Sequence, residues 1–311
     1  MLEINYKAEK FGKHWGAALQ GSHILKCSWA DLVWAAITVG KRDFSDVIKF
    51  GNVSLNEMIY RTYILYANLN EVKNKLYRSS IYNNQDTTEK AFTSYFVGMM
   101  TSKLIAEKLF DTPWLLHLES LPGFKNGLIG ISRPDLIGLT IKRKEWIIIE
   151  AKGRTNTFSR AAQNVAKKQT RQLRHISGAL PILRVANQSY FNDSLHVRIT
   201  DPDEYDDEAI DIDINVNSYL THYYSNFIGM FEDVNVKNIN KMEYVYKYID
   251  ELDLTLGMNL TLYYDLVTDI ENTNLMEFES YVESGIHLYK DGLMIELGDK
   301  WDSNNMSKLS V

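Results

Sequence analysis

The chain has a single cysteine, Cys27, among its 311 residues. One cysteine excludes an intramolecular disulfide and a zinc site built from several thiolates, and it suits a reducing compartment. No apolar stretch approaches the roughly 18 residues that a membrane-spanning helix needs. The first residues also lack the apolar run of a signal peptide. We therefore expect a cytoplasmic protein that does not contact a membrane.

Linkers and nucleotide motifs are missing as well. Only 5 prolines are present, and no Gly-, Ser- or Pro-rich stretch separates the chain into parts. A Gly-rich phosphate loop and helicase motifs are absent, which argues against ATP hydrolysis by this chain. The hydrophobic content of 45% and the charged content of 24% are those of an ordinary globular protein.

The net charge of −6 conceals a strong segregation of charge. Residues 142–174 contain ten basic and two acidic residues, a local charge of +8, whereas residues 201–213 contain eight acids and no Lys or Arg. A basic block of this kind is what a phosphate backbone requires, although a solvated surface is the simpler interpretation of a charge run alone.

Hydrophobic patterning predicts an α/β protein in three regions. Residues 1–85 form a mostly helical N-terminal region, with helices at 29–40 and 55–77. Residues 86–200 follow the order helix (87–110), strands (114–120, 132–142, 145–152), helix (160–174) and strands (179–191, 195–200). Residues 201–311 form a mostly helical C-terminal region, with helices at 217–232 and 241–272 and a terminal hairpin at 285–298 that turns at Asp291–Gly292.

The segment RPDLIGLTIKRKEWIIIEAKGR (133–154) carries the chemistry. Its all-apolar Ile run is typical of a strand buried on both faces, and this strand ends in Glu150, Ala151 and Lys152. Strand alternation puts Glu150 and Lys152 on one face. A two-residue turn at Arg143–Lys144, with Lys142 opposite Glu145, would place Asp135 opposite Lys152 and cluster all three side chains.

Asp135 and Glu150 supply two carboxylates, and the backbone carbonyl of Ala151 a third oxygen, for a hard divalent cation such as Mg²⁺ or Mn²⁺. Lys152 would orient the attacking water or stabilise charge in the transition state. The alternative is a salt bridge at the edge of a sheet, although two acids and a lysine at the end of an apolar strand are costly unless they pair or bind metal.

Pro134–Asp135, followed by Glu150-Ala151-Lys152 at the end of an Ile run, resembles the PD-(D/E)xK nuclease superfamily, which includes restriction endonucleases, junction resolvases and recombination exonucleases. The core of that family has the order helix–strand–strand–strand–helix–strand, which matches residues 86–200. The resemblance implies a restriction-endonuclease-like core and metal-dependent phosphodiester hydrolysis, with DNA more common as substrate than RNA. By analogy, it also suggests a role in restriction or anti-phage defence.

Several residues outside the motif are candidates for supporting roles. Many members of the family add an acid from the first helix, and Glu89 is the best match, although its spacing from Asp86 is also that of a helix capping box. Five residues are candidates for contact with nucleic acid: Arg154, Arg160, Lys167, Arg171 and Gln169. Among them, Lys167 and Arg171 form one helical stripe with Arg174.

The sequence thus predicts a Mg²⁺- or Mn²⁺-dependent nuclease acting on nucleic acid, with a homodimer or a larger complex possible. Two alternatives remain open: a module that binds nucleic acid without cutting it, and an interaction subunit that a partner activates. The acidic segment 201–213 and the flanking regions are compatible with the second alternative.

Overall fold

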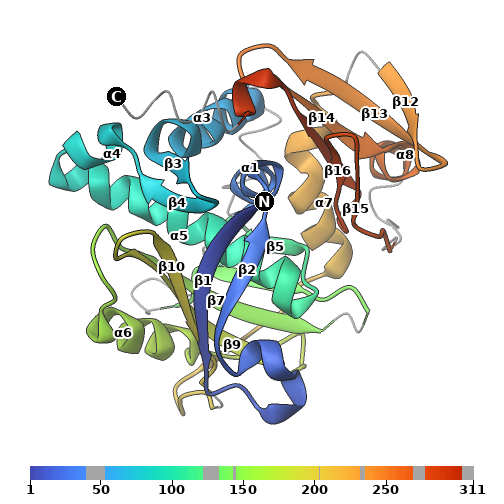
Figure 1. Cartoon of the computed structure of the whole chain (residues 1–311). Helices are drawn as coiled ribbons and strands as arrows, with labels where there is room; N and C mark the ends of the chain where they lie inside the picture. The colour runs from blue at the N-terminus through green and yellow to red at the C-terminus, as the bar shows by residue number, and fades with distance from the viewer. Residues whose placement is uncertain are drawn as a thin grey trace.

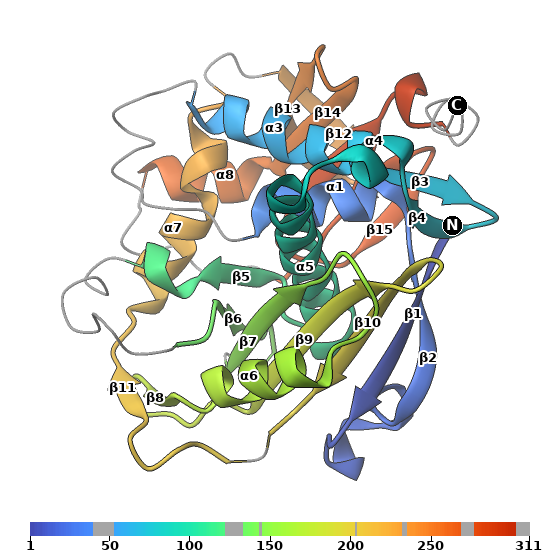
Figure 2. The ribbon, with the colours of Figure 1, turned by 90° about the vertical axis from the view of Figure 1, so that its left-hand side faces the viewer.

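The structure, a computed structural model, describes residues 1–39, 53–121, 133–142, 145–202, 204–231, 235–268 and 277–302, with the backbone alone at 53 and 54. The chain is a mixed α/β protein, as its pattern predicts, and a nine-stranded mixed sheet runs through the described part (Figures 1 and 2). Within those ranges, no helix is both long and apolar enough to cross a membrane.

The large sheet combines strands from distant parts of the sequence. Its order is β3 (Leu69–Val72), β4 (Lys75–Arg78), β1 (Leu2–Glu9), β10 (Leu195–Thr200), β9 (Leu183–Phe191), β7 (Trp146–Gly153), β6 (Leu136–Leu139) and β5 (Trp114–His117), with β2 (Gly21–Cys27) also paired to β1. β5, β6 and β7 form an antiparallel meander, and β9 lies parallel to β7. The predicted helix–strand–strand–strand–helix–strand order is therefore present, with the short strand β8 (Leu173–Ile176) added before β9.

Two helices cover opposite faces of the sheet at β7 and β9. α5 (Thr87–Phe110) begins at Asp86, whose side chain accepts the backbone amides of Thr88 and Glu89, and it coincides with the predicted helix. α6 (Arg160–Thr170) begins at Ser159 and buries Gln163, Ala166 and Thr170 against the sheet. A parallel β7–β9 pair needs such a crossover helix.

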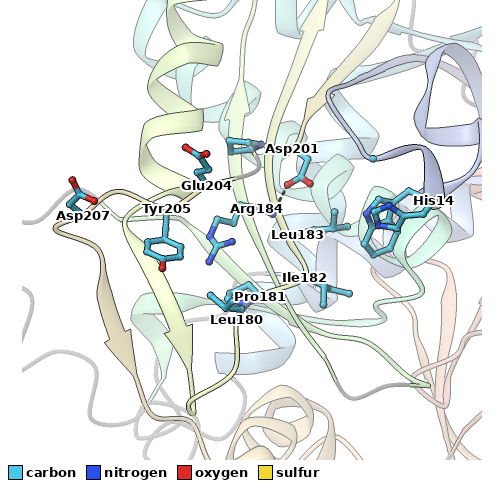
Figure 3. A pocket seen from close by; sticks show the side chains of 13 residues that line it. His14, Leu180, Pro181, Ile182, Leu183, Arg184, Asp201, Glu204, Tyr205 and Asp207 are labelled. Carbon is cyan, nitrogen blue, oxygen red and sulfur yellow. Dashed lines mark hydrogen bonds between the residues drawn. The ribbon is translucent and has the colours of Figure 1, made fainter.

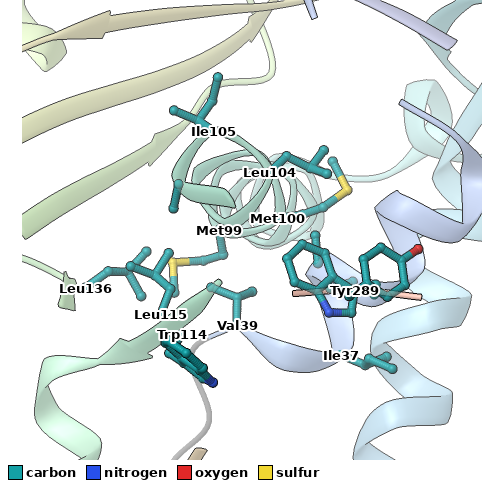
Figure 4. Close-up of a cluster of buried hydrophobic side chains, with 14 of the residues drawn as sticks. Ile37, Val39, Met99, Met100, Leu104, Ile105, Trp114, Leu115, Leu136 and Tyr289 are labelled. Atoms are coloured by element: carbon teal, nitrogen blue, oxygen red, sulfur yellow. The ribbon is translucent and has the colours of Figure 1, made fainter. Parts of the chain in front are cut away.

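α5 is the centre of the hydrophobic core (Figure 4). Met100, Leu104 and Ile105 are fully buried. At its N-terminal half the helix touches β7 directly: a Cβ on Gly153 would lie 1.6 Å from the carbonyl oxygen of Ser94, and one on Gly98 would lie 2.8 Å from the amide nitrogen of Gly153. Two glycines thus permit the close approach of helix and strand.

The N-terminal region is less helical than predicted. The helices α1 (Trp29–Thr38), α3 (Val53–Asn68) and α4 (Ser80–Asn84) are present, but β1 and β2 precede them and β3 and β4 follow α3. The predicted helix at 55–77 ends early because Lys73 and Asn74, both with positive φ, form the turn of a β3–β4 hairpin. β1 pairs in parallel with β10, so this region shares its sheet with the motif strands.

The prediction of a mostly helical C-terminal region is also wrong. α7 (Val216–Ile228) is confirmed, but a six-stranded sheet replaces most of the helix expected at 241–272. Its order is β12 (Asn235–Ile239), β13 (Met242–Ile249), β14 (Leu254–Asn259), β17 (Leu293–Leu297), β16 (Ile286–Leu288) and β15 (Tyr281–Glu283), with α8 (Leu260–Thr268) after β14. Positive φ at Asn240, Lys241 and Asp253 marks the turns between the first three strands. The terminal hairpin at Asp291–Gly292 is confirmed as β16–β17.

Candidate active site

Strand β7 brings the predicted motif to the end of a fully buried strand. Ile147, Ile148 and Ile149 have no exposed surface. The contact between Gly153 and Ser94 shows that Ala151 and Gly153 face α5. By alternation, Glu150 and Lys152 face the opposite side of the sheet, which α6 covers.

The register of β6 and β7 differs from the predicted one by two residues. Leu136 lies opposite Ile149, and the Thr140 amide donates to the carbonyl of Glu145 at 2.9 Å, so residues 141–144 make the connection. The predicted two-residue turn with Lys142 opposite Glu145 is therefore wrong, although Arg143 and Lys144 themselves lie outside the described residues. A shift of two residues keeps every side chain on its face, and Asp135 falls beside Glu150 instead of Lys152.

Two backbone-to-side-chain hydrogen bonds and one ion pair link the three motif residues. The Asp135 amide donates to Glu150 Oε2 at 2.9 Å, and the Ala151 amide donates to Asp135 Oδ2 at 3.1 Å. The Lys152 ammonium forms an ion pair with Glu150 Oε1. The backbone of Asp135 is held as well, because its carbonyl accepts the amide of Leu118 at 2.8 Å. The predicted cluster of Asp135, Glu150 and Lys152 is thus present in the geometry.

Electrostatics at this cluster centre on Glu150. Its side chain has no exposed surface, and this burial, followed by the nearby charge of Asp135, raises its pKa to about 8, against the opposing effect of Lys152. Lys152 remains partly open to solvent, with 28% of its side chain exposed. A buried carboxylate beside a second carboxylate and only one lysine is a site that additional positive charge would stabilise.

The residues present fit a divalent cation with few protein ligands. Two carboxylates, Asp135 and Glu150, share one site, and Glu150 is short of compensating charge. Within the described ranges, no group of three or more His, Cys, Asp or Glu side chains could hold a metal ion. This arrangement does not suit a closed zinc site, but Mg²⁺ is commonly held by one or two carboxylates together with water and substrate phosphates.

Glu89 has the capping role rather than the catalytic one. Its Oε2 accepts the amide of Asp86 at 3.1 Å, and the side chain is exposed. Phe92, three residues further along α5, is 46% exposed and contacts Tyr60 of α3, so this side of the helix does not face the sheet. The side of α5 that meets the sheet carries Ser94 and Gly98 instead, and it covers the face opposite to Glu150 and Lys152.

The predicted basic stripe on the second helix divides into two parts. Arg171 pairs with Asp206 at 3.0 Å, and Arg174 makes a two-pronged contact with Asp211 at 2.8 and 3.0 Å. The acidic segment therefore neutralises the end of the stripe. Asp206 does so from a loop, and Asp211 from β11 (Ile210–Ile212), which forms a small parallel sheet with β8. Lys167 lies on the helix proper, away from these two acids.

The remaining predicted residues lie around the motif. Arg160 is exposed at the first position of α6. Arg154 continues from β7, and its amide donates to the carbonyl of Ser189 at 2.9 Å. Gln169 donates to the carbonyl of Arg133 at 3.2 Å, so it braces the segment that leads into Asp135. Its contact in the structure is with the protein backbone, and its contact with nucleic acid stays a prediction.

Two glutamines near the motif are not among the residues that the sequence pattern predicts. Gln188 lies opposite Lys152 in the parallel β7–β9 pair, and its side chain donates to Gln163 of α6 at 3.1 Å. Gln163 donates in turn to the carbonyl of Ala186 at 2.9 Å. The run of polar residues Asn187, Gln188 and Ser189 within β9 (LRVANQSYF) is the signal that would have pointed to this contact.

The described cavities lie away from the motif. A pocket of about 580 Å³ at the start of β9 is lined by Arg184, Asp201, Glu204 and Tyr205, among others (Figure 3). A second pocket of about 500 Å³ shares His14, Trp15 and Ile182 with it. Because Gln188 and Lys152 lie toward the other end of the same strands, neither pocket contains the candidate site.

No family model, curated protein or solved structure matches this chain. The function has to be argued from the site itself.

Proposed function

We propose that this protein is a metal-dependent nuclease that hydrolyses phosphodiester bonds, with DNA as substrate and Asp135, Glu150 and Lys152 as its catalytic residues. The observation that carries the proposal is the joint placement of two carboxylates and a lysine at the end of an apolar central strand, where the backbone amide of Asp135 donates to Glu150 Oε2 at 2.9 Å and Lys152 pairs with Glu150. On grounds of stability alone, such a cluster is unfavourable.

Each residue has a role that its surroundings support. Asp135 and Glu150 would hold Mg²⁺ or Mn²⁺, with the carbonyl of Ala151 as a further oxygen ligand. When bound, the cation would supply positive charge at the phosphate being cleaved. Lys152, with 28% of its side chain exposed, reaches solvent, so its ammonium would orient the attacking water or stabilise charge on the phosphate.

The fold supports the finer assignment to a restriction-endonuclease-like core. That family's element order is the one found from α5 to β9, and the motif strand is the central strand expected of it. A role in restriction or anti-phage defence, in the cytoplasm, remains part of this proposal and rests on the resemblance alone.

A partner-activated or silent subunit is the second candidate, and one observation favours it. The acidic segment already occupies Arg171 and Arg174, at 3.0 and 2.8 Å, where a phosphate backbone would otherwise bind. Under this alternative, a partner or a homodimer contact would move the acidic segment before nucleic acid could bind there.

The deciding experiment digests supercoiled plasmid and linear duplex with purified full-length protein in Mg²⁺, Mn²⁺ or EDTA. Asp135→Ala and Lys152→Ala are the test variants, and Glu243→Ala with Lys241→Ala, both exposed on the C-terminal sheet, is the matched control. We expect metal-dependent cutting by the wild type and the control only. Cutting that survives Asp135→Ala would refute the assigned site, and an inert wild type would favour the silent subunit.

A further inference from the structure

Helix α6 presents an unusual outward face. The helix carries three basic residues and no acid. Its exposed stripe consists of Ala161, Asn164, Val165 and Lys168, at the spacing i, i+3, i+4 and i+7 that defines one side of a helix. Val165 is 52% exposed although the helix has a buried side available for apolar residues. In Figure 2 this helix lies in front of the sheet.

A row of side chains crosses the sheet beneath α6. Lys152 of β7 lies opposite Gln188 of β9, Gln188 opposite Arg198 of β10, and Arg198 opposite Lys7 of β1. Neighbouring strands lie about 4.8 Å apart, so Arg198 and Lys7 are roughly 10 and 14 Å from the strand of Lys152. The start of α6 lies over Gln188 of this row, because the Gln188 side chain donates to the carbonyl of Ser159, the residue that caps the helix, at 2.9 Å.

The far end of this row is a basic patch, defined by Lys7, Lys10, Arg160, Lys167 and Arg198. Arg160 and Lys167 belong to α6, which begins beside Gln188, the neighbour of Arg198 in this row, and Lys10 directly follows β1. Burial and the charge of Lys10, against that of Glu9, lower the pKa of Lys167, in keeping with this placement. One acid, Glu9, lies among them, 2.8 Å from Lys7 and 3.8 Å from Arg198. Five cations and one acid leave a net charge of +4.

The candidate catalytic site and the basic patch therefore lie on opposite flanks of α6. Gln169 reaches from one flank to the segment before Asp135 at 3.2 Å. On the other flank, Lys167 faces the cations of β1 and β10. An α-helix is about 10–12 Å wide with its side chains, and the major groove of B-form DNA is about 12 Å wide.

We propose that α6 is a recognition helix that enters the major groove of duplex DNA, with the strand to be cut at Lys152 on one flank and the phosphates of the second strand at the basic patch on the other. This inference rests on the proposed function for the identity of the ligand. Asn164 and Lys168 are suited to hydrogen bonds with adenine and guanine edges, and Val165 and Ala161 to the thymine methyl group.

The geometry selects this ligand over other nucleic acids. A single strand would reach the catalytic flank but would leave the basic patch without a phosphate partner. Double-stranded RNA has a deep, narrow major groove that a helix does not enter. The ligand is therefore B-form duplex DNA, read by sequence over the few base pairs that a helix of 11 residues, roughly 16 Å long, contacts.

The first arm of the test measures sequence preference without cleavage. Full-length protein in EDTA selects from a pool of random 20-base-pair duplexes, and the bound fraction is sequenced. We expect an enriched motif, and Asn164→Ala should lower the preference at one or two positions by about 10-fold. Asn83→Ala, an exposed asparagine of α4, is the matched control. A motif that is absent, or unchanged in Asn164→Ala, would overturn the recognition role.

The second arm measures the basic patch through the salt dependence of binding. Lys7→Gln with Lys10→Gln should reduce the slope of log Kobs against log salt by about 0.9 for each phosphate that the patch no longer neutralises on duplex DNA. The slope on a single-stranded oligonucleotide of the same length should not change. Lys241→Gln with Lys247→Gln, exposed on the other sheet, is the control. Equal slopes for both double variants would refute the patch.

The two arms separate this inference from the nuclease proposal. Sequence-dependent binding that requires Asn164, combined with no cutting in any metal, would support recognition by α6 and refute the nuclease. Metal-dependent cutting with sequence preference unchanged in Asn164→Ala would support the nuclease and refute recognition by α6.

Discussion

Two lysine–carboxylate clusters of the molecule differ in how completely their charges are satisfied. In the core, Lys103 donates to the hydroxyl of Tyr223 at 2.7 Å, and that hydroxyl donates to Asp291 at 2.6 Å. Trp34 donates to Asp291 at 2.8 Å, and its ring lies 4.5 Å from the Lys103 ammonium. At the motif, by contrast, Glu150 pairs with one partly exposed lysine, Lys152, and has the charge of a second carboxylate, Asp135, nearby.

The difference shows that a buried charge does not by itself mark a functional site. Lys103 and Asp291 are fully buried, yet aromatic side chains saturate them and connect α5, α1, α7 and the β16–β17 turn. Glu150 is equally buried but has an excess of negative charge beside it and a route to solvent through Lys152. Incomplete compensation next to solvent is the feature that points to a ligand.

The largest expected effect is on catalysis at the cluster of Asp135, Glu150 and Lys152. Asp135→Ala should reduce the rate of metal-dependent cleavage at least about 1000-fold, or about 4 kcal/mol of transition-state stabilisation, because the variant lacks a metal ligand. The midpoint of thermal unfolding should fall by no more than a few degrees. Cleavage rates and calorimetry on the same preparation test both statements. An unfolded variant would instead make Asp135 part of the structural core.

At the buried cluster of Lys103 and Asp291, a substitution should affect stability rather than catalysis. Asp291→Ala leaves Trp34 and Tyr223 without their acceptor and the Lys103 ammonium without a nearby negative charge, so we expect the free energy of unfolding to fall by about 3–5 kcal/mol. Asp250→Ala, exposed in the turn between β13 and β14, should stay within about 0.5 kcal/mol of the wild type. Urea titration measures both. Equal stability of the two variants would contradict the structural role.

Glu150→Gln should stabilise the metal-free protein while abolishing cleavage. The folded-state pKa of Glu150, about 8, exceeds the ordinary value of 4.5, so the folded state holds more protons between these values and stability falls as pH rises. The variant lacks this decline, so its stability relative to the wild type should rise with pH between these two values, by up to about 1.4 kcal/mol per pH unit. Added Mg²⁺ should stabilise only the wild type. A variant less stable at pH 8 would contradict this.

The smallest expected effect is on the pH dependence of stability that Lys103 contributes, which has the opposite sign to that of Glu150. Burial lowers the pKa of Lys103 to about 7, against the charges of Asp291 and Glu107, whereas the ordinary value is 10.5. The unfolded state then holds more protons between pH 7 and 10.5, so this group makes stability rise with pH, by about 1.4 kcal/mol per pH unit at most. Lys103→Met should remove the rise in urea titrations from about pH 7 to about pH 9.5. An unchanged pH dependence would exclude Lys103 as its source.

The motif and its flanking elements could be predicted because their signals are local. Asp86 and Glu89 define the start of α5 at capping-box spacing, and the Ile run of 147–149 identifies a strand buried on both faces. The cluster of Asp135 with Glu150 is present despite the wrong turn because the register differs by an even number of residues. Period-two alternation tolerates such an error and fails for an odd one.

The rest depended on contacts that no local pattern contains. The segment MEYVYKYI (242–249) mixes strand formers with charged residues, and its pattern predicts a helix, whereas the turns at Asn240–Lys241 and Asp253 make it the middle of a meander. The acidic partners of Arg171 and Arg174 lie 35 and 37 positions away in the sequence. Lys7 meets Arg198 only because β1 pairs with β10.

The position of β1 between β4 and β10 also has a consequence for the order in which the chain folds. β1 completes its pairing only after residues 195–200 have been made, and Trp34 of α1 bonds to Asp291, 257 positions later. Contacts this distant slow folding, because the entropy of closing the intervening loop comes before any gain. A chain that stops short of Asp291 would thus carry the complete catalytic motif on an unfinished scaffold, so that under the proposed function synthesis itself would delay the appearance of a DNA-cutting site.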